Sequence, residues 1–143
     1  MISLELARQL KAVGLVWHAT TNDFFAIPDR DMDDRLFVLS DIQAQLDIFR
    51  GWPVVTFHGT AEWALDYILT SEVVWMPREE QLREALLSQL ADEVASELCL
   101  SFKDSHYACS ISWGGESEQF TASSAADAYG KALLQIFKNR RST

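Results

Sequence analysis

The sequence predicts an α+β fold, a single domain spanning residues 1–143 and built from two α-β-β-β-α-like halves, with antiparallel meanders packed by helices. Segments with helical spacing of apolar residues alternate with segments in which apolar and polar residues alternate. The predicted elements occur twice in a similar order, which divides the halves near residues 1–72 and 73–143. A chain of 143 residues, 48% of them hydrophobic, is also long enough to bury a core without disulfides or metal.

The first predicted element is a short amphipathic helix that starts after Ser3 and stops at Gly14. Leu6, Leu10 and Val13 lie at helical spacing between these two residues. Serine is a favoured N-cap, and glycine is favoured at the left-handed position that ends a helix.

Strands are predicted next. Residues 23–27 and 36–40 form a hairpin around the acidic stretch 28–35. Residues 42–48 alternate strictly between apolar and polar, but Ile42, Leu46 and Phe49 also fit the spacing of a helix. Both a strand and a helix are therefore compatible with this segment, and a third strand is favoured. Residues 54–57 are a short β-branched run that adds a fourth strand.

Two helices are predicted in the middle of the chain. Between residues 60 and 71, Glu62, Asp66 and Thr70 form one narrow polar stripe on an otherwise apolar helix, which must therefore be covered nearly all round. The second helix has Pro77 in its first turn and one apolar edge that repeats every four residues, at Leu82, Leu86, Leu90 and Val94.

The last third predicts a three-stranded meander and a closing helix. A two-residue turn at Asp104 and Ser105 sets Leu100 opposite Cys109, and a second turn at 114–115 sets Cys109 opposite Phe120. Cys99 then lies on the other face, which favours two reduced thiols. Ser124 and Asp127 resemble a capping box, and the helix that follows has an apolar face made by Tyr129, Leu133, Ile136 and Phe137.

The charge and hydropathy of the chain exclude several classes of partner. Twelve Lys and Arg against 21 Asp and Glu give a net charge of −9, and most of such a surface would repel the phosphate backbone of a nucleic acid. No apolar stretch approaches the roughly 20 residues that cross a bilayer, and the N-terminus has no signal-peptide pattern. We therefore expect a cytoplasmic protein without membrane insertion.

One acidic segment has the spacing of a calcium loop. Asp29, Asp31 and Asp33 alternate as in the first half of an EF-hand. Asp34 stands where that loop needs glycine and Ser40 where it needs a bidentate Glu, so that a solvated hairpin tip is the commoner explanation. No cofactor is predicted, because the chain has neither a P-loop nor a dinucleotide-binding glycine motif.

One hypothesis for the function is a small enzyme. His58 with Glu62 or Asp66 would supply an acid–base pair if these side chains converged at a cleft. Cys109 with His106 is a poor nucleophile and base, because Cys109 lies on the apolar face of its strand, where a thiolate is disfavoured. We predict no catalytic residue.

Aromatic residues point instead to protein binding. Region 51–87 holds three of the five tryptophans, and tryptophan is enriched at interface hot spots. The predicted partner-binding residues are Trp52, Trp63, Tyr67 and Trp75. A position in the core is favoured for Trp63, which lies on an apolar face, whereas a homodimer formed through region 51–87 would bury Trp52 and Trp75.

Three runs, DFFAIPDRDMDDR, RGWPVVTFHGTAEWALDYILT and EVVWMPREEQLREALL, resemble a family of small uncharacterised bacterial proteins, some of which are labelled pilus assembly protein of the CpaE type. The stretch from Leu98 to Phe137 also resembles the β-β-β-α unit of HicB-type antitoxins. The first resemblance implies a non-enzymatic interaction or accessory module of a pilus or surface assembly. The second implies a regulator that binds a basic toxin. No functional residue is carried over from either family.

Overall fold

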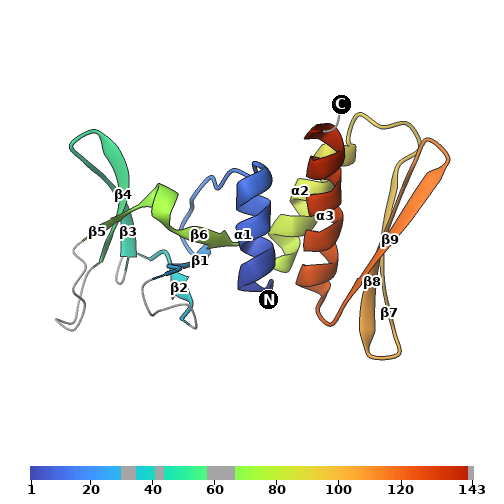
Figure 1. The fold of residues 1–143 in the computed structure, drawn as a ribbon, viewed down its shortest axis with the longest axis horizontal. Coiled ribbons are helices and arrows are strands. Elements are labelled where there is room, and N and C mark those ends of the chain that lie inside the picture. Colours follow the sequence, from blue (N-terminus) through green and yellow to red (C-terminus); the bar gives the residue numbers. More distant parts are fainter. Residues whose placement is uncertain (30–34, 41–43, 58–66, 142–143) are drawn as a thin grey trace. The chain divides into compact units, whose positions relative to one another are not determined.

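The computed structural model describes residues 1–29, 35–40, 44–57 and 67–141. The chain divides into two compact units, and Figure 1 shows their elements. Met1–Leu15 and Pro77–Thr143 form what we call the helix–sheet unit, and Val16–Met76 form the strand unit. The described residues contain three α-helices and three small antiparallel sheets, which confirms the α+β class.

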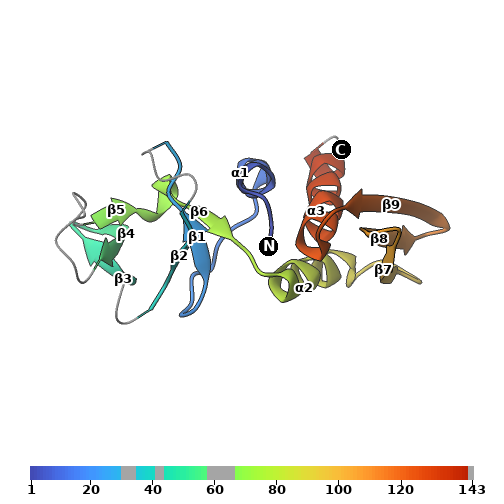
Figure 2. The same ribbon diagram turned by 90° about the horizontal axis from the view of Figure 1, so that it is seen from below.

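The helix–sheet unit combines one sheet with all three helices of the described chain. Its elements are α1 (Leu4–Val13), α2 (Glu79–Leu90), β7 (Glu97–Lys103), β8 (His106–Trp113), β9 (Glu116–Ala122) and α3 (Ala125–Arg141). The two views show α3 on one face of the β7–β8–β9 meander and no helix on the opposite face (Figures 1 and 2). α3 contacts β8 and β9, where Cys109 and Ile111 are fully buried.

The predicted register of this meander is confirmed. Leu100 pairs with Cys109, and Cys109 pairs with Phe120. Asp104 and Ser105 both have positive φ, 52° and 63°, as a type I′ turn requires. The cysteines are free, Cys99 exposed and Cys109 buried, and they belong to opposite faces of the sheet.

α3 contacts both other helices of its unit. At Gly130, α3 lies close against α1, because a Cβ there would be 2.7 Å from Cδ2 of Leu6. At the C-terminal end, Arg140 donates to the carbonyl oxygen of Gln89 at 2.9 Å and Arg141 to that of Ala12 at 3.2 Å. These two carbonyls lie at the negative ends of α2 and α1, where a cation is favourable.

The strand unit consists of two three-stranded sheets. Its elements are β1 (Phe24–Ala26), β2 (Phe37–Val38), β3 (Ala44–Phe49), β4 (Trp52–Phe57), β5 (Tyr67–Leu69), the 3₁₀ turn η1 (Thr70–Glu72) and β6 (Val74–Met76). The strand orders are β2-β1-β6 and β3-β4-β5. The predicted hairpin of β1 and β2 is confirmed. The strand favoured over a helix for residues 42–48 is confirmed from Ala44 on, and residues 42–43 lie outside the described part of the chain.

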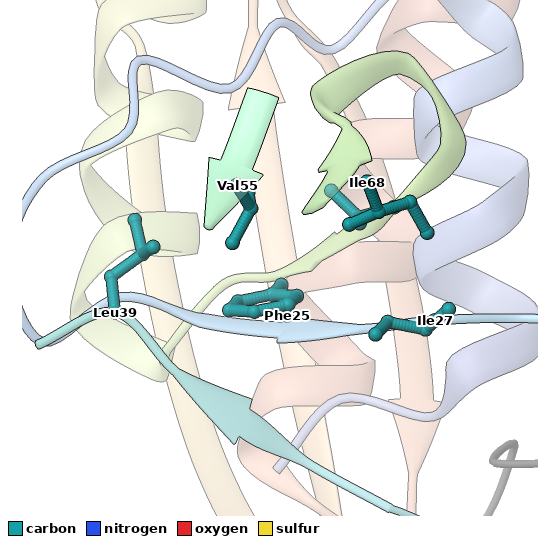
Figure 3. Packing of buried hydrophobic residues seen from close by; sticks show 6 residues of the cluster. Phe25, Ile27, Leu39, Val55 and Ile68 are labelled. Atoms are coloured by element: carbon teal, nitrogen blue, oxygen red, sulfur yellow. The ribbon is translucent and has the colours of Figure 1, made fainter. Parts of the chain in front are cut away.

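One apolar cluster holds the two sheets of the strand unit together, and Figure 3 shows it. It contains Phe25, Ile27, Leu39, Val55, Ile68 and Val73, all nearly inaccessible to solvent. Trp17 and Phe37 extend it, with ring centroids 5.9 and 5.4 Å from that of Phe25. Burial of several large apolar side chains from both sheets is the main source of stability for a unit of this size.

The core also contains a carboxylate that the sequence did not single out. Asp23 is only 1% exposed, and its Oδ2 accepts the indole N–H of Trp17 at 2.9 Å and the backbone N–H of Thr20 at 3.0 Å. A buried carboxylate needs such donors, because an unpaired charge in the interior is costly. Asp23 therefore fixes the turn at the entrance to β1.

The helix predicted for residues 60–71 is wrong where the structure describes it. Residues 60–66 lie outside the described part of the chain, but Tyr67–Leu69 are strand β5 and Thr70–Glu72 are a 3₁₀ turn. Ile68 pairs with Val55 and joins the buried cluster, which places an apolar segment in a sheet without the all-round cover that a helix would need. Tertiary packing thus overrides the helical spacing.

Two further expectations need correction. α2 begins at Glu79 and ends at Leu90, so that Pro77 precedes the helix and Val94 lies beyond it, 84% exposed. The described residues of the first half do not form an α-β-β-β-α unit either, because α1 contacts α3 and belongs with the C-terminal part of the chain. The described strands between residues 16 and 76 form two sheets of their own. A sequence pattern shows that a helix has an apolar face but does not show which element covers that face.

Candidate functional site

Among the described residues of the strand unit, those of the β3–β4 hairpin include the most exposed large apolar side chains. Its strands pair from Ala44 opposite Phe57 to Phe49 opposite Trp52. The loop is Arg50–Gly51, with φ of 53° and 83°, a type I′ turn whose twist matches that of the two strands. Glycine meets the need for positive φ at the second position without strain.

Large apolar side chains surround this turn on both faces of the hairpin. Ile48 is 74% exposed, Trp52 66% and Phe49 41%. Phe49 and Trp52 are opposite each other and share one face, whereas Ile48 alternates with them and belongs to the other. An apolar tip of this kind is exposed on two sides, unlike a sheet face that lies over a core.

Pro53 separates this tip from the body of the sheet. It pairs with Ile48 at a position where β3 and β4 exchange no hydrogen bonds, so its missing N–H faces the β5 side. The pairing of β4 with β5 begins only at Val54 opposite Leu69. Because proline cannot donate to a longer β5, residues 48–53 extend beyond the third strand.

Asp47 modifies the free edge of β3. Its Oδ1 accepts the backbone N–H of Ile48 at 2.8 Å, and that N–H points away from β4. A charged side chain on an edge strand opposes the addition of another strand. The tip is therefore accessible through its side chains more than through its backbone.

The charge of the chain is concentrated in the unit that carries the hairpin. Residues 16–76 hold ten acidic and three basic residues, a formal charge of −7, and the other residues hold eleven acidic and nine basic, a charge of −2, which together make the −9 of the chain. At the tip itself, the guanidinium carbon of Arg50 lies 5.1 Å from the ring centroid of Phe49. This contact holds the aromatic ring beside the turn.

The predicted partner-binding residues are separated by the fold. Trp52 is at the hairpin tip, and Tyr67 is in β5 of the same sheet, opposite Thr56. Trp75 is in β6 of the other sheet and is half-buried. Its indole N–H is inaccessible and has no hydrogen-bond partner among the residues that the structure describes. Trp63 lies outside the described residues. Sequence reasoning missed Ile48 and Phe49, although the Arg–Gly pair between two alternating runs is a signal for this hairpin.

The metal and acid–base hypotheses fall mostly outside the described part of the chain. Asp29 is described and exposed, whereas Asp31, Asp33, His58, Glu62 and Asp66 are not described. Among the residues that are, no group of three or more His, Cys, Asp or Glu is placed to hold a metal ion.

Cys109 and His106 both lie in the described part of the chain. Burial, with a smaller effect of the nearby Cys99, raises the pKa of the Cys109 thiol from 9.0 to about 11. His106 is exposed, and its Nδ1 lies 3.0 Å from the carbonyl oxygen of Asp104. Cys109 stays protonated at neutral pH, so it is not an activated nucleophile.

A surface hollow of about 360 Å³ lies in the helix–sheet unit between α1, β9 and α3. Two of its charged side chains make contacts within the fold. Asp127 accepts the backbone N–H of Ser3, and Lys131 donates to the carbonyl oxygen of Thr121 at 2.7 Å. Asp127 and Lys131 therefore join α3 to α1 and β9.

No described helix is both long and apolar enough to cross a membrane. A scan against protein-family models and searches of curated proteins and of solved structures found no match. The β3–β4 hairpin is the candidate site on structural grounds alone.

Proposed function

We propose that the protein is a non-enzymatic protein-interaction module, and that the β3–β4 hairpin inserts its apolar tip into a cleft of a basic protein partner. The observation that carries this proposal is the exposure of Ile48 on one face of the tip and of Phe49 and Trp52 on the other. A flat partner surface would cover only one of these faces. A cleft that receives the tip covers both.

The charge distribution supports a partner that differs from this chain. A second copy would bring another formal charge of −7 against the strand unit, which opposes association through the hairpin. A basic protein would be attracted to the same unit, and the attraction would raise the rate of encounter. Its cleft would be apolar inside, where Trp52 and Ile48 insert, and basic at the rim.

The exposed side chains are large enough to hold a partner. A tryptophan that exposes two thirds of its surface offers on the order of 150 Å² for contact. At about 25 cal/mol per Å², its burial contributes about 4 kcal/mol before the entropy of association is subtracted. Trp52 is therefore the expected hot spot, and Ile48 supplies the second contact from the opposite face.

Site-specific photo-cross-linking in the native host tests the proposal. A photoreactive phenylalanine analogue at position 52 should cross-link to one basic protein, and the same analogue at position 94 is the matched control. Val94 is also exposed and apolar but lies in the helix–sheet unit. The captured protein is then purified, and its binding to wild type, Trp52→Ser, Ile48→Ser and Val94→Ser is measured by calorimetry.

We expect Trp52→Ser and Ile48→Ser each to weaken binding at least about tenfold, and Val94→Ser to leave it unchanged. Affinity for the wild type should fall with added salt, because the attraction between opposite charges is screened. Binding that is equal in Trp52→Ser and wild type would contradict the proposal. Capture of an acidic protein would contradict the assigned partner chemistry.

The two sequence resemblances would specify what this partner is. A component of a pilus or surface assembly corresponds to the first, and a small basic toxin corresponds to the HicB-type likeness of the β7–β8–β9–α3 region. The identity of the cross-linked protein distinguishes between them.

A further inference from the structure

The helix–sheet unit has a free sheet edge at β7. Among the described strands, the order β7-β8-β9 leaves the outer side of β7 without a neighbour in the sheet. A two-residue turn joins Lys103 to His106, so hydrogen bonds with β8 are exchanged at Lys103, Ser101, Cys99 and Glu97. The backbone groups of the alternate residues, Leu98, Leu100 and Phe102, therefore point outward.

The side chains of these outward-facing positions are apolar and only partly covered. Phe102 is 62% exposed, and Leu98 and Leu100 are half-buried. All three are on the face of the sheet that carries α3, but α3 contacts β8 and β9. The face of the unit thus ends in an apolar border along β7.

The sequence of β7, ELCLSFK, is complementary to itself in one antiparallel register. With Leu100 opposite Leu100 of a second copy, Leu98 lies opposite Phe102, and Glu97 lies opposite Lys103. The outward backbone groups of Leu98, Leu100 and Phe102 would form three hydrogen-bonded pairs, about six hydrogen bonds in all. Both ends of the paired strands would carry opposite charges.

The two other long edge strands lack this complementarity. On β9, Lys131 donates to the carbonyl oxygen of Thr121, which points away from β8. If two copies of β9 paired in a register centred on Gln119, Glu118 would lie opposite Phe120. On β3, the side chain of Asp47 accepts a hydrogen bond from the N–H of Ile48, which points away from β4. In the part of the chain that the structure describes, we find no side chain bound to the free edge of β7.

We propose that two copies of this chain pair through β7 in the register centred on Leu100, which joins their meanders into one six-stranded antiparallel sheet. The pairing is two-fold symmetric, so each contact occurs twice. It places the α3 helices of both copies on the same side of the sheet and covers Phe102 with Leu98 of the other copy. The interface is small, so the dimer should dissociate on dilution.

Charge-swapped variants test this register in the full-length protein by sedimentation equilibrium. The mass of the wild type should rise from 16.2 kDa towards twice that value as the concentration increases. Glu97→Lys and Lys103→Glu place like charges opposite each other, and each should weaken the dimer roughly tenfold. An equimolar mixture of the two variants, or the double variant, restores opposite charges and should restore dimerisation.

Glu116→Lys on β9 is the matched control, because it makes the same change of net charge at another exposed strand position of the sheet. It should leave the dimer as strong as in the wild type or slightly stronger. The proposal is overturned if the wild type stays monomeric up to about 1 mM. It is equally overturned if the double variant is as weak as the two single variants.

A cysteine pair provides a second, geometric test. In the proposed register Cys99 lies opposite Ser101 of the other copy at a pair without hydrogen bonds, where Cα atoms are about 4.5 Å apart. Ser101→Cys should therefore form covalent dimers under mild oxidation, seen on a non-reducing gel. Cys99→Ser/Ser101→Cys has one thiol per strand in offset positions and should not. Equal cross-linking of the two variants, or none in either, contradicts the register.

This inference is independent of the proposed hairpin function, since it concerns a different unit and a different occupant. Trp52→Ser should leave the dimer intact, and Glu97→Lys should leave the binding surface of the hairpin unchanged. If both hold, a dimer carries two hairpins, which increases the avidity for a partner with repeated sites.

Discussion

The backbone N–H of Ser3 donates to Oδ1 of Asp127 at 2.8 Å, a bond between residues 124 positions apart in the chain. Ser3 is the N-cap of α1, and its hydroxyl accepts the N–H of Leu6. Asp127 is in the first turn of α3, where its own N–H donates to the hydroxyl of Ser124 at 3.1 Å. One carboxylate therefore lies at the positive ends of two neighbouring helices.

We expect Asp127→Ala to lower the free energy of unfolding by about 1 kcal/mol, because the N–H of Ser3 loses its acceptor and the first turn of α3 loses a favourable charge. Asp127→Asn keeps an acceptor oxygen and should cost less. Urea denaturation followed by far-UV circular dichroism measures both changes. Asp92→Ala removes an exposed loop carboxylate as a control, and an equal loss in this variant would contradict the specific role of Asp127.

Asp23 should be the most sensitive polar residue of the strand unit. Asp23→Ala leaves the indole N–H of Trp17 and the backbone N–H of Thr20 without their acceptor, and we expect a loss of about 3 kcal/mol. Tryptophan fluorescence during urea unfolding reports on this unit, which contains four of the five tryptophans. His18→Ala, at an exposed position of the same unit, should be neutral. A loss below about 1 kcal/mol in Asp23→Ala would contradict this account.

Asp47 should protect the protein from aggregation through the edge of β3. Asp47→Val removes both the acceptor for the Ile48 N–H and the negative charge beside exposed apolar residues, so we expect faster aggregation. Light scattering during incubation at 37 °C measures the rate. Asp47→Asn keeps the acceptor but loses the charge, so its aggregation rate should fall between those of Asp47→Val and the wild type. If Asp47→Val remains as soluble as wild type, the edge is protected by other means.

The two thiols should differ in reactivity and in their effect on stability. Cys99 is exposed and should react with a thiol reagent at once, whereas Cys109 should react only on unfolding. Burial raises the pKa of Cys109 from 9.0 to about 11, so the folded state holds its proton at pH values where the unfolded state releases it. This contribution to stability is complete below pH 9 and is lost as the pH rises through 11, a change on the order of 2 kcal/mol.

Urea unfolding at pH 8 and pH 11 checks this effect by comparing wild type with Cys109→Ala. The variant should be less stable at pH 8, because it leaves a small cavity, but its stability should fall less between the two pH values. The same pH dependence in both proteins would show that other groups, such as the buried Tyr129, dominate the alkaline loss.

Local chemistry was sufficient to predict the most regular part of the fold. Asp104–Ser105 and Gly114–Gly115 accept the positive φ of tight turns, and strict alternation on either side leaves one register that groups the apolar residues. The caps of α1 were predicted for the same reason, since Ser3 and Gly14 act on the nearest turn of the helix.

Prediction was less successful where two periods fit the same residues. The run at 42–49 matched both strand and helix. Residues 67–71, the described end of the helix predicted for 60–71, form β5 and most of a 3₁₀ turn. The strand conformation of Ile68 is decided by its contacts with Val55 and the buried cluster, whose residues come from distant parts of the chain. The spacing of apolar residues shows which side of a segment is apolar. Where that spacing fits both a helix and a strand, the residues packed against the segment decide between them.

By itself, then, the sequence determined the α+β class, the β7–β9 register, the helix caps and the acidic charge, because each depends on neighbouring residues or on composition. The tertiary structure alone decided that α1 joins α3, that Asp23 is buried beside Trp17, and that Ile48 and Phe102 remain exposed. An apolar residue reads the same in a sequence whether another element covers it or not. The exposed hairpin tip and the free β7 edge are therefore visible only in the folded chain.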